Sequence, residues 1–117
     1  MAASYGTGGG RPRAADDGWT VVEVPGDLDF YSAPDFAKYL GGIAAAGARR
    51  LVIDMRDVAF MDSSGLRVLL NAARDLRENG GALRLAAPDE QVLRLIEVTQ
   101  VGPLLPTYRD VGSASGD

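Results

Sequence analysis

The chain has 117 residues, a formal net charge of −4 and neither histidine nor cysteine. These absences exclude a Ser-His-Asp triad, a cysteine nucleophile, a disulfide and any imidazole or thiolate metal site. An enzyme built from the remaining residue types would have to rely on carboxylates, arginine and backbone amides. We expect no catalytic residue, no metal and no cofactor. The negative charge argues against binding to nucleic acid or to an anionic membrane. This length, with 46% hydrophobic residues, fits one small domain with one core.

Both ends of the chain differ in composition from the middle. Residues 1–17 are rich in glycine and small polar side chains and are predicted to form a flexible arm. Residues 111–117 are poor helix formers and are predicted to form a flexible tail. The folded domain is expected to span residues 18–110. No apolar run is long enough to cross a bilayer and no signal segment opens the chain, so we expect a soluble cytoplasmic protein.

Strand and helix patterns alternate between the two ends. Strands are predicted at 20–24, 51–54, 82–86 and 104–108, and helices at 32–47, 63–79 and 89–101. Ser32 is expected to cap the first helix, with Asp35 as an acidic capping-box partner. The alternation predicts an α/β fold, with a mainly parallel or mixed sheet of about four to five strands and helices packed on it. Residues 11–14 form a poor first strand, so that edge is expected to be short or missing.

The stretch Met61-Asp62-Ser63-Ser64-Gly65-Leu66 follows a predicted strand and includes the start of a predicted helix. Its serines are therefore predicted at a helix N-terminus, where backbone N–H groups lack partners and the helix dipole is positive. Such a position favours either a hydroxyl cap or an anion such as a phosphate. The local pattern alone leaves the structural cap and the phosphorylation switch both open.

Two further segments join this one in a family resemblance. Residues 60–66, the acidic loop Gly26-Asp27-Leu28-Asp29 and the segment 104–108 together resemble the STAS domain of bacterial anti-sigma factor antagonists, over about residues 19–110. In that family, the serine directly after the aspartate is phosphorylated by the partner anti-sigma factor, an ATP-dependent serine kinase. Residue by residue, this serine corresponds to Ser63.

The resemblance implies a partner-switching protein. The unphosphorylated form would bind the anti-sigma factor and free the sigma factor, phosphorylation of Ser63 would release the partner, and a serine phosphatase would reset the cycle. The residues implied in partner binding are Asp27, Asp29, Asp62, Ser63, Ser64 and Gly65. Gly65 is expected to let the backbone of a partner come close.

Two other functions have partial support in the sequence. The strand ending at Asp54 resembles the phosphoacceptor strand of a receiver domain, but Lys38 is the only lysine and Asp27 and Asp29 are not adjacent, so that class is disfavoured. The alternative that remains is a STAS regulatory subunit of a transporter or of a stress-sensing assembly.

Overall fold

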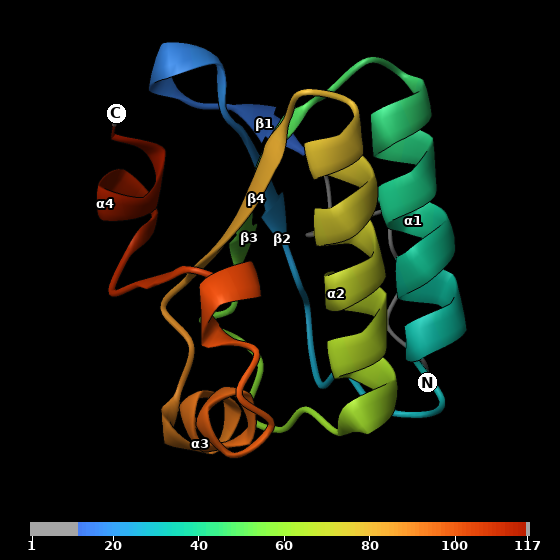
Figure 1. Ribbon diagram of the computed structural model, residues 1–117, viewed down its shortest axis with the longest axis vertical. Coiled ribbons are helices and arrows are strands. Elements are labelled where there is room, and N and C mark those ends of the chain that lie inside the picture. The colour runs from blue at the N-terminus through green and yellow to red at the C-terminus, as the bar shows by residue number, and fades with distance from the viewer. Residues whose placement is uncertain (1–11, 117) are drawn as a thin grey trace.

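A single mixed sheet forms the centre of the protein in the computed structural model, which describes residues 12–116 (Figure 1). Its five strands lie in chain order, β1-β2-β3-β4-β5. They are β1 (Arg13–Ala14), β2 (Thr20–Glu23), β3 (Arg50–Asp54), β4 (Ala82–Ala86) and β5 (Thr107–Tyr108). The β1–β2 pair is antiparallel and the other three pairs are parallel. The predicted α/β fold with a mixed sheet is therefore confirmed.

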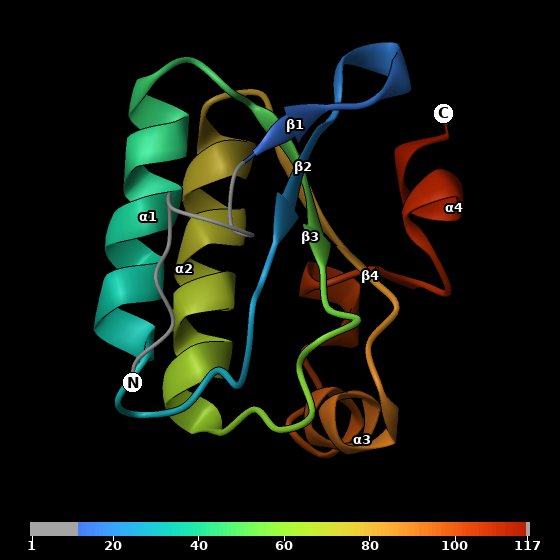
Figure 2. The same cartoon turned by 180° about the vertical axis from the view of Figure 1, so that it is seen from behind.

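The helices are α1 (Ala33–Ala45), α2 (Ser63–Glu78), α3 (Glu90–Val98) and α4 (Val111–Ser115), with short 3-10 helices η2 (Asp16–Gly18) and η3 (Gly102–Leu104). Helices α1, α2 and α3 connect the parallel strands, and α4 follows the last strand. Helices α1 and α2 lie side by side over one face of the sheet, and α4 lies on the other side (Figures 1 and 2). Helix α3 lies below the sheet, near the end where α2 begins. Within residues 12–116, no helix combines the length and the apolar character needed to cross a membrane.

The sheet has a core on each face because successive strand side chains point to opposite sides. Val22 and Ile53 belong to the larger core under α1 and α2, whereas Val21 and Val52 belong to a smaller core with Trp19. The three helices predicted between the strands contribute the larger core. The smaller core needs a cover that the sequence patterns did not predict.

That cover is α4, which corrects the predicted boundary at the C-terminus. The expected flexible tail, residues 111–117, instead contains a helix whose Ala114 is fully buried in the smaller core. Asp110 caps this helix by accepting the backbone N–H of Ser113 at 2.7 Å. Packing against the sheet and this cap outweigh the low helix propensity of glycine and serine.

The predicted N-terminal boundary also differs from the structure. Part of the expected arm, within residues 13–17, forms β1 and most of η2, and Ala15 donates its N–H to the carbonyl of Trp19 at 2.8 Å. The first strand is thus present and short, as the poor strand propensity of residues 11–14 suggested. Residues 1–11, the rest of the predicted arm, lie outside the described residues.

Candidate functional site

The predicted site residues come together at one end of the molecule, where α2 begins. Two segments form this surface, residues 26–32 before α1 and residues 60–65 at the start of α2, and we call them the switch rim. A short stretch of strand-like pairing joins them: Leu28 forms a parallel bridge with Met61, its N–H bonds the carbonyl of Phe60, and its carbonyl accepts the N–H of Asp62. The acidic loop and the serine segment therefore share one rim.

Asp62 is the N-cap of α2. Its Oδ1 accepts the backbone N–H groups of Ser64 and Gly65, at 2.8 and 3.2 Å. Its Oδ2 accepts the N–H of Phe30 at 3.0 Å. A carboxylate at this position satisfies donors that the helix cannot satisfy itself and interacts favourably with the helix dipole. The carboxylate of Asp62 thus holds both the helix and the neighbouring loop.

Ser63 is the first residue of α2 and is exposed. Among the described residues, its hydroxyl has no hydrogen-bond partner that would hold it in place. Ser64 is half-buried and donates its backbone N–H to Asp62. Either serine could have been the N-cap of α2, but Asp62 caps the helix instead. The Ser63 hydroxyl is therefore left accessible.

This arrangement changes what the helix N-terminus can do for a phosphate. The sequence suggested that the free helix amides could hold a phosphate on Ser63, but those of Ser64 and Gly65 already bond Asp62. A phosphate on Ser63 would add roughly two negative charges beside that carboxylate. The N–H groups of Ser64 and Gly65 are therefore not free to neutralise a phosphate on Ser63.

Asp27 ties the two segments of the rim together. Its Oδ1 accepts the backbone N–H of Phe60 at 3.1 Å, and its own carbonyl accepts the hydroxyl of Ser32 at 2.8 Å. The residue is exposed. Asp27 therefore combines a structural bond with a charge that a partner can meet.

Asp29 and Ser32 form the capping arrangement at the start of α1. Asp29 Oδ1 accepts the N–H groups of Tyr31 and Ser32, at 2.9 and 3.0 Å, and the N–H of Asp29 bonds the hydroxyl of Ser32 at 3.0 Å. The predicted pairing of Ser32 with Asp35 is wrong, because Ser32 makes no side-chain cap bond to α1. The reciprocal box lies one turn earlier, since the loop already turns helically at Asp29.

Gly65 is buried where the acidic loop crosses α2. A Cβ at this position would lie 2.5 Å from the carbonyl oxygen of Leu28 and 2.7 Å from its Cβ. The close approach expected for a partner's backbone is thus made by the chain's own loop. Gly65 lets the loop at Leu28 pack closely against α2, and it is itself buried.

Several residues of the rim were missed by the sequence analysis. Three aromatic side chains are exposed there, Phe30, Tyr31 and Phe60. Gln91 of α3 bonds Met61 twice, accepting its N–H and donating to its carbonyl, each at 2.8 Å. The aromatic pair in a polar loop was a signal that could have been noticed. Nothing in the sequence marks Gln91, because its role depends on how α3 packs.

The disfavoured acidic site at Asp54 is structural. This carboxylate is buried, lies 3.1 Å from the guanidinium of Arg56 and accepts the N–H of the same residue. Glu23 on the adjacent strand lies 3.9 Å from that guanidinium. Within residues 12–116, no group of three or more acidic side chains is placed to hold a metal ion.

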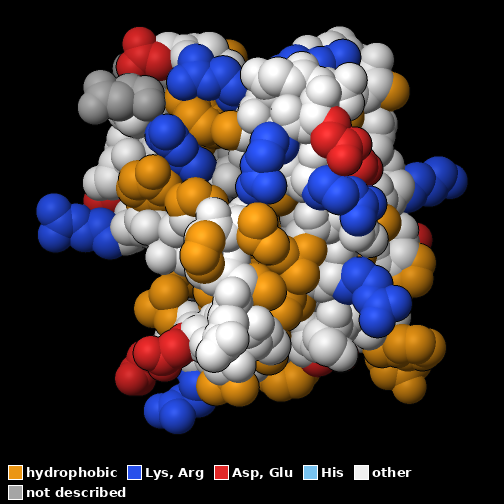
Figure 3. All heavy atoms as spheres, in the orientation of Figure 1, with side chains coloured by type: hydrophobic (Ala, Val, Ile, Leu, Met, Phe, Trp, Pro, Cys, Tyr) orange, Lys and Arg blue, Asp and Glu red, His pale blue; other side chains and the backbone are white. Residues whose placement is uncertain are grey.

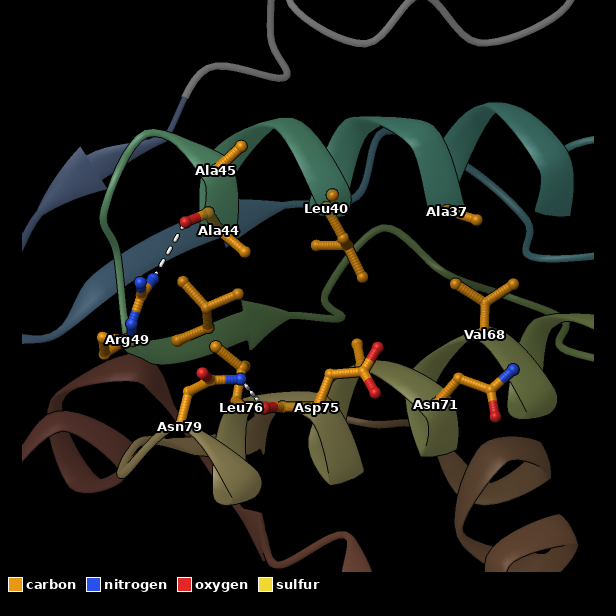
Figure 4. A pocket seen from close by; sticks show the side chains of 13 residues that line it. Ala37, Leu40, Ala44, Ala45, Arg49, Val68, Asn71, Asp75, Leu76 and Asn79 are labelled. Atoms are coloured by element: carbon orange, nitrogen blue, oxygen red, sulfur yellow. Dashed lines mark hydrogen bonds between the residues drawn. The ribbon is translucent and has the colours of Figure 1, made fainter.

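A separate hollow lies between α1 and α2, away from the rim (Figure 4). It encloses about 390 Å³ between small side chains of α1, such as Ala37 and Ala44, and the α2 residues Val68 and Asp75. None of the predicted site residues lines it. The candidate site is therefore the exposed rim and not this groove.

The sequence of this chain is similar to one family of known proteins. The family model described as the STAS domain matches residues 12–114. The chain is 37% identical over 78 residues to an anti-sigma-B factor antagonist of Bacillus subtilis, covering 67% of this chain and 71% of the relative.

Solved structures show the same fold. An anti-sigma factor antagonist from Mycobacterium paratuberculosis has a TM-score of 0.79 at 28% identity, covering 90% of this chain and 88% of that one. The anti-sigma factor antagonist SpoIIAA has been solved unphosphorylated, with a TM-score of 0.68 at 20% identity over 89% of this chain and 91% of that one. The phosphorylated form of SpoIIAA, from Bacillus, has a TM-score of 0.67 at 19% identity over 89% of this chain and 95% of that one.

Proposed function

The chain belongs to the STAS domain family, and from that membership we propose that it is an anti-sigma factor antagonist whose unphosphorylated form binds an anti-sigma factor. Binding occupies the anti-sigma factor and frees the sigma factor for transcription. The names of the similar proteins, which are themselves anti-sigma factor antagonists, support this role.

The switch in this proposal is Ser63. The anti-sigma factor acts as an ATP-dependent serine kinase and phosphorylates the Ser63 hydroxyl, and a serine phosphatase removes the phosphate. The observation that carries this assignment is the division of labour at the start of α2: Asp62 caps the helix, and the exposed Ser63 hydroxyl has no structural bond. Ser64, which is half-buried, is less accessible to a kinase.

Charge explains why phosphorylation releases the partner. Asp27, Asp29 and Asp62 already lie on the same rim as Ser63, and a phosphate adds roughly two further negative charges. A partner packed over Ser63 would have to bury this charge without a matching cation. Such burial costs several kcal/mol, which is enough to abolish a micromolar complex.

In this proposal the chain works in the cytoplasm, where sigma factors act. The chain itself catalyses no reaction. It has no histidine or cysteine, and its buried Asp54 is paired with Arg56. The reacting groups, ATP and its metal ion, come from the kinase. The chain contributes the acceptor hydroxyl and the surface that docks it.

The test is intact mass spectrometry after incubation with ATP and each anti-sigma kinase encoded in the same genome. Wild type and Ser64→Ala should gain one phosphoryl group, and Ser63→Ala should gain none. Phosphate on Ser63→Ala would move the switch elsewhere. A pull-down that recovered a transporter component instead of an anti-sigma factor would favour the transporter or stress-sensing alternative.

A further inference from the structure

Two large aromatic side chains stand out from the switch rim beside Ser63. Phe30 is 70% exposed and Tyr31 is 85% exposed. Figure 3 shows hydrophobic side chains projecting at the lower right, the end of the molecule where α1 begins in Figure 1. The two rings meet edge to face with their centroids 5.6 Å apart. Aromatic side chains that are left in water at such a position are typical of the anchors of protein interfaces.

The backbone under this pair is held rigidly. The N–H of Phe30 bonds Asp62 Oδ2 at 3.0 Å, and the N–H of Tyr31 bonds Asp29 Oδ1 at 2.9 Å. The carbonyl of Asp29 accepts the N–H of Ala33 at 2.8 Å, which makes the loop continuous with α1. A preorganised anchor loses little conformational entropy on binding, so its apolar area contributes more fully to affinity.

The pair is also continuous with the phosphorylation site. The backbone N–H of Phe30 bonds Asp62, the residue directly before Ser63. Phe60, which is 45% exposed, precedes the same segment in the sequence. A kinase that brings the terminal phosphate of ATP onto the Ser63 hydroxyl must cover the surface around that hydroxyl. The loop that carries the exposed rings is hydrogen-bonded to the segment that such a partner covers.

We propose that Phe30 and Tyr31 are the hydrophobic anchor by which this chain docks its anti-sigma factor. This inference rests on the proposed function and adds the residues that supply the affinity. The partner surface that fits is an apolar pocket bordered by basic side chains, because Asp27, Asp29 and Asp62 lie on the same rim as the two rings.

The anchor and the switch have separate tasks. The rings can bury apolar area against the partner in either phosphorylation state. The phosphorylation state of Ser63 sets how much negative charge the partner must bury beside them. Loss of a ring should therefore weaken docking of the unphosphorylated chain and raise the KM for its phosphorylation. It should leave kcat nearly unchanged, because the rings do not touch the reacting atoms.

The experiment is calorimetric titration of the full unphosphorylated chain with the purified anti-sigma factor, in the absence of ATP. The variants are Phe30→Ala and Tyr31→Ala. Val98→Ala is the matched control, since Val98 is also 70% exposed but lies at the end of α3, outside the switch rim. Each aromatic variant should bind about tenfold or more weakly, and the control should bind like wild type. All three should keep the wild-type melting temperature.

Each result decides the inference. Wild-type affinity in both aromatic variants would overturn the anchor while leaving the proposed function intact. An unchanged affinity together with loss of self-association in sedimentation would reassign the rings to a contact with a second copy of this chain. If wild type bound no anti-sigma factor and was phosphorylated by none, the proposed function would fail and the anchor with it.

Discussion

Asp62 accepts the backbone N–H of Phe30 at 3.0 Å, across 32 positions of the chain. The same carboxylate caps α2 through Ser64 and Gly65. One side chain thus positions the serine segment and the aromatic loop relative to each other. The rim is built as a unit, so changes at Asp62 and at Ser63 should have very different effects on stability.

We predict that Asp62→Ala lowers the free energy of unfolding by about 1 to 2 kcal/mol, because two helix donors lose their cap. Asp62→Asn keeps a capping oxygen and should lose less. Ser63→Ala, which removes no structural bond, should change stability by no more than about 0.5 kcal/mol. Urea denaturation of the three variants measures the ranking. An equal loss in Asp62→Ala and Ser63→Ala would show that the serine shares the cap.

Gly65 and Gly42 offer a matched pair of glycine substitutions. Gly65→Ala puts a methyl group against the backbone of Leu28 and should destabilise the fold by about 1 to 3 kcal/mol. Gly42 lies in α1 with nothing within 4 Å of a Cβ, so Gly42→Ala should stabilise by roughly 0.5 to 1 kcal/mol. Thermal melts should show shifts of opposite sign. Equal shifts would contradict the close crossing of the loop and α2.

Asp29→Asn separates the charge of this residue from its capping role. The amide oxygen can still accept the N–H groups of Tyr31 and Ser32, so the melting temperature should stay nearly constant. Loss of the charge should weaken binding to a basic anti-sigma surface and make it less dependent on salt. Asp35→Asn, which changes a charge on α1 outside the rim, is the control. Equal affinities for all three proteins would leave Asp29 with a structural role only.

The cap of α4 predicts a pH dependence that Trp19 can report. The backbone hydrogen bond from Ser113 is the main reason that the pKa of Asp110 lies below its ordinary value of 3.8. Because the folded pKa is the lower one, the contribution of this cap is fully present above the unfolded value and is lost as the pH falls through the folded value.

Trp19 is the only tryptophan and lies in the same core as Ala114 of α4. Arg84 stacks on its ring at 4.3 Å and donates to the carbonyl of Ala114 at 2.8 Å. Tryptophan fluorescence of wild type should therefore change on acidification below about pH 4, ahead of the change in Asp110→Asn. Superimposable acid titrations of the two proteins would argue against this coupling.

The order of strands and helices followed from the sequence because their patterns are local. The alternation from Thr20 to Ala86, and the glycines at the end of α2, mark the elements through hydrophobic spacing and turn chemistry. Helix α4 could not be predicted in this way. Its residues are weak helix formers, and its stability comes from Ala114 packing on a sheet face assembled from distant strands.

At the site, too, some features follow from the local sequence and others depend on contacts between distant segments. The position of Ser63 at a helix start was predictable from the neighbouring residues. The choice of Asp62 rather than a serine as the cap, and of Leu28 as the group that requires Gly65, depends on the loop that crosses α2. Contacts between segments some 30 residues apart leave no pattern in the local sequence. These contacts determine which residue caps α2 and which residue packs against Gly65.

The most direct test of the central claim is titration of the anti-sigma factor with Ser63→Asp, Ser63→Asn and Ser63→Ala. Charge release predicts that Ser63→Asp binds about tenfold or more weakly than wild type. It predicts that Ser63→Ala binds like wild type and that Ser63→Asn, which adds bulk without charge, stays close to it. Wild-type affinity in Ser63→Asp would contradict a charge switch at this serine, and so would an equal loss of affinity in Ser63→Asp and Ser63→Asn.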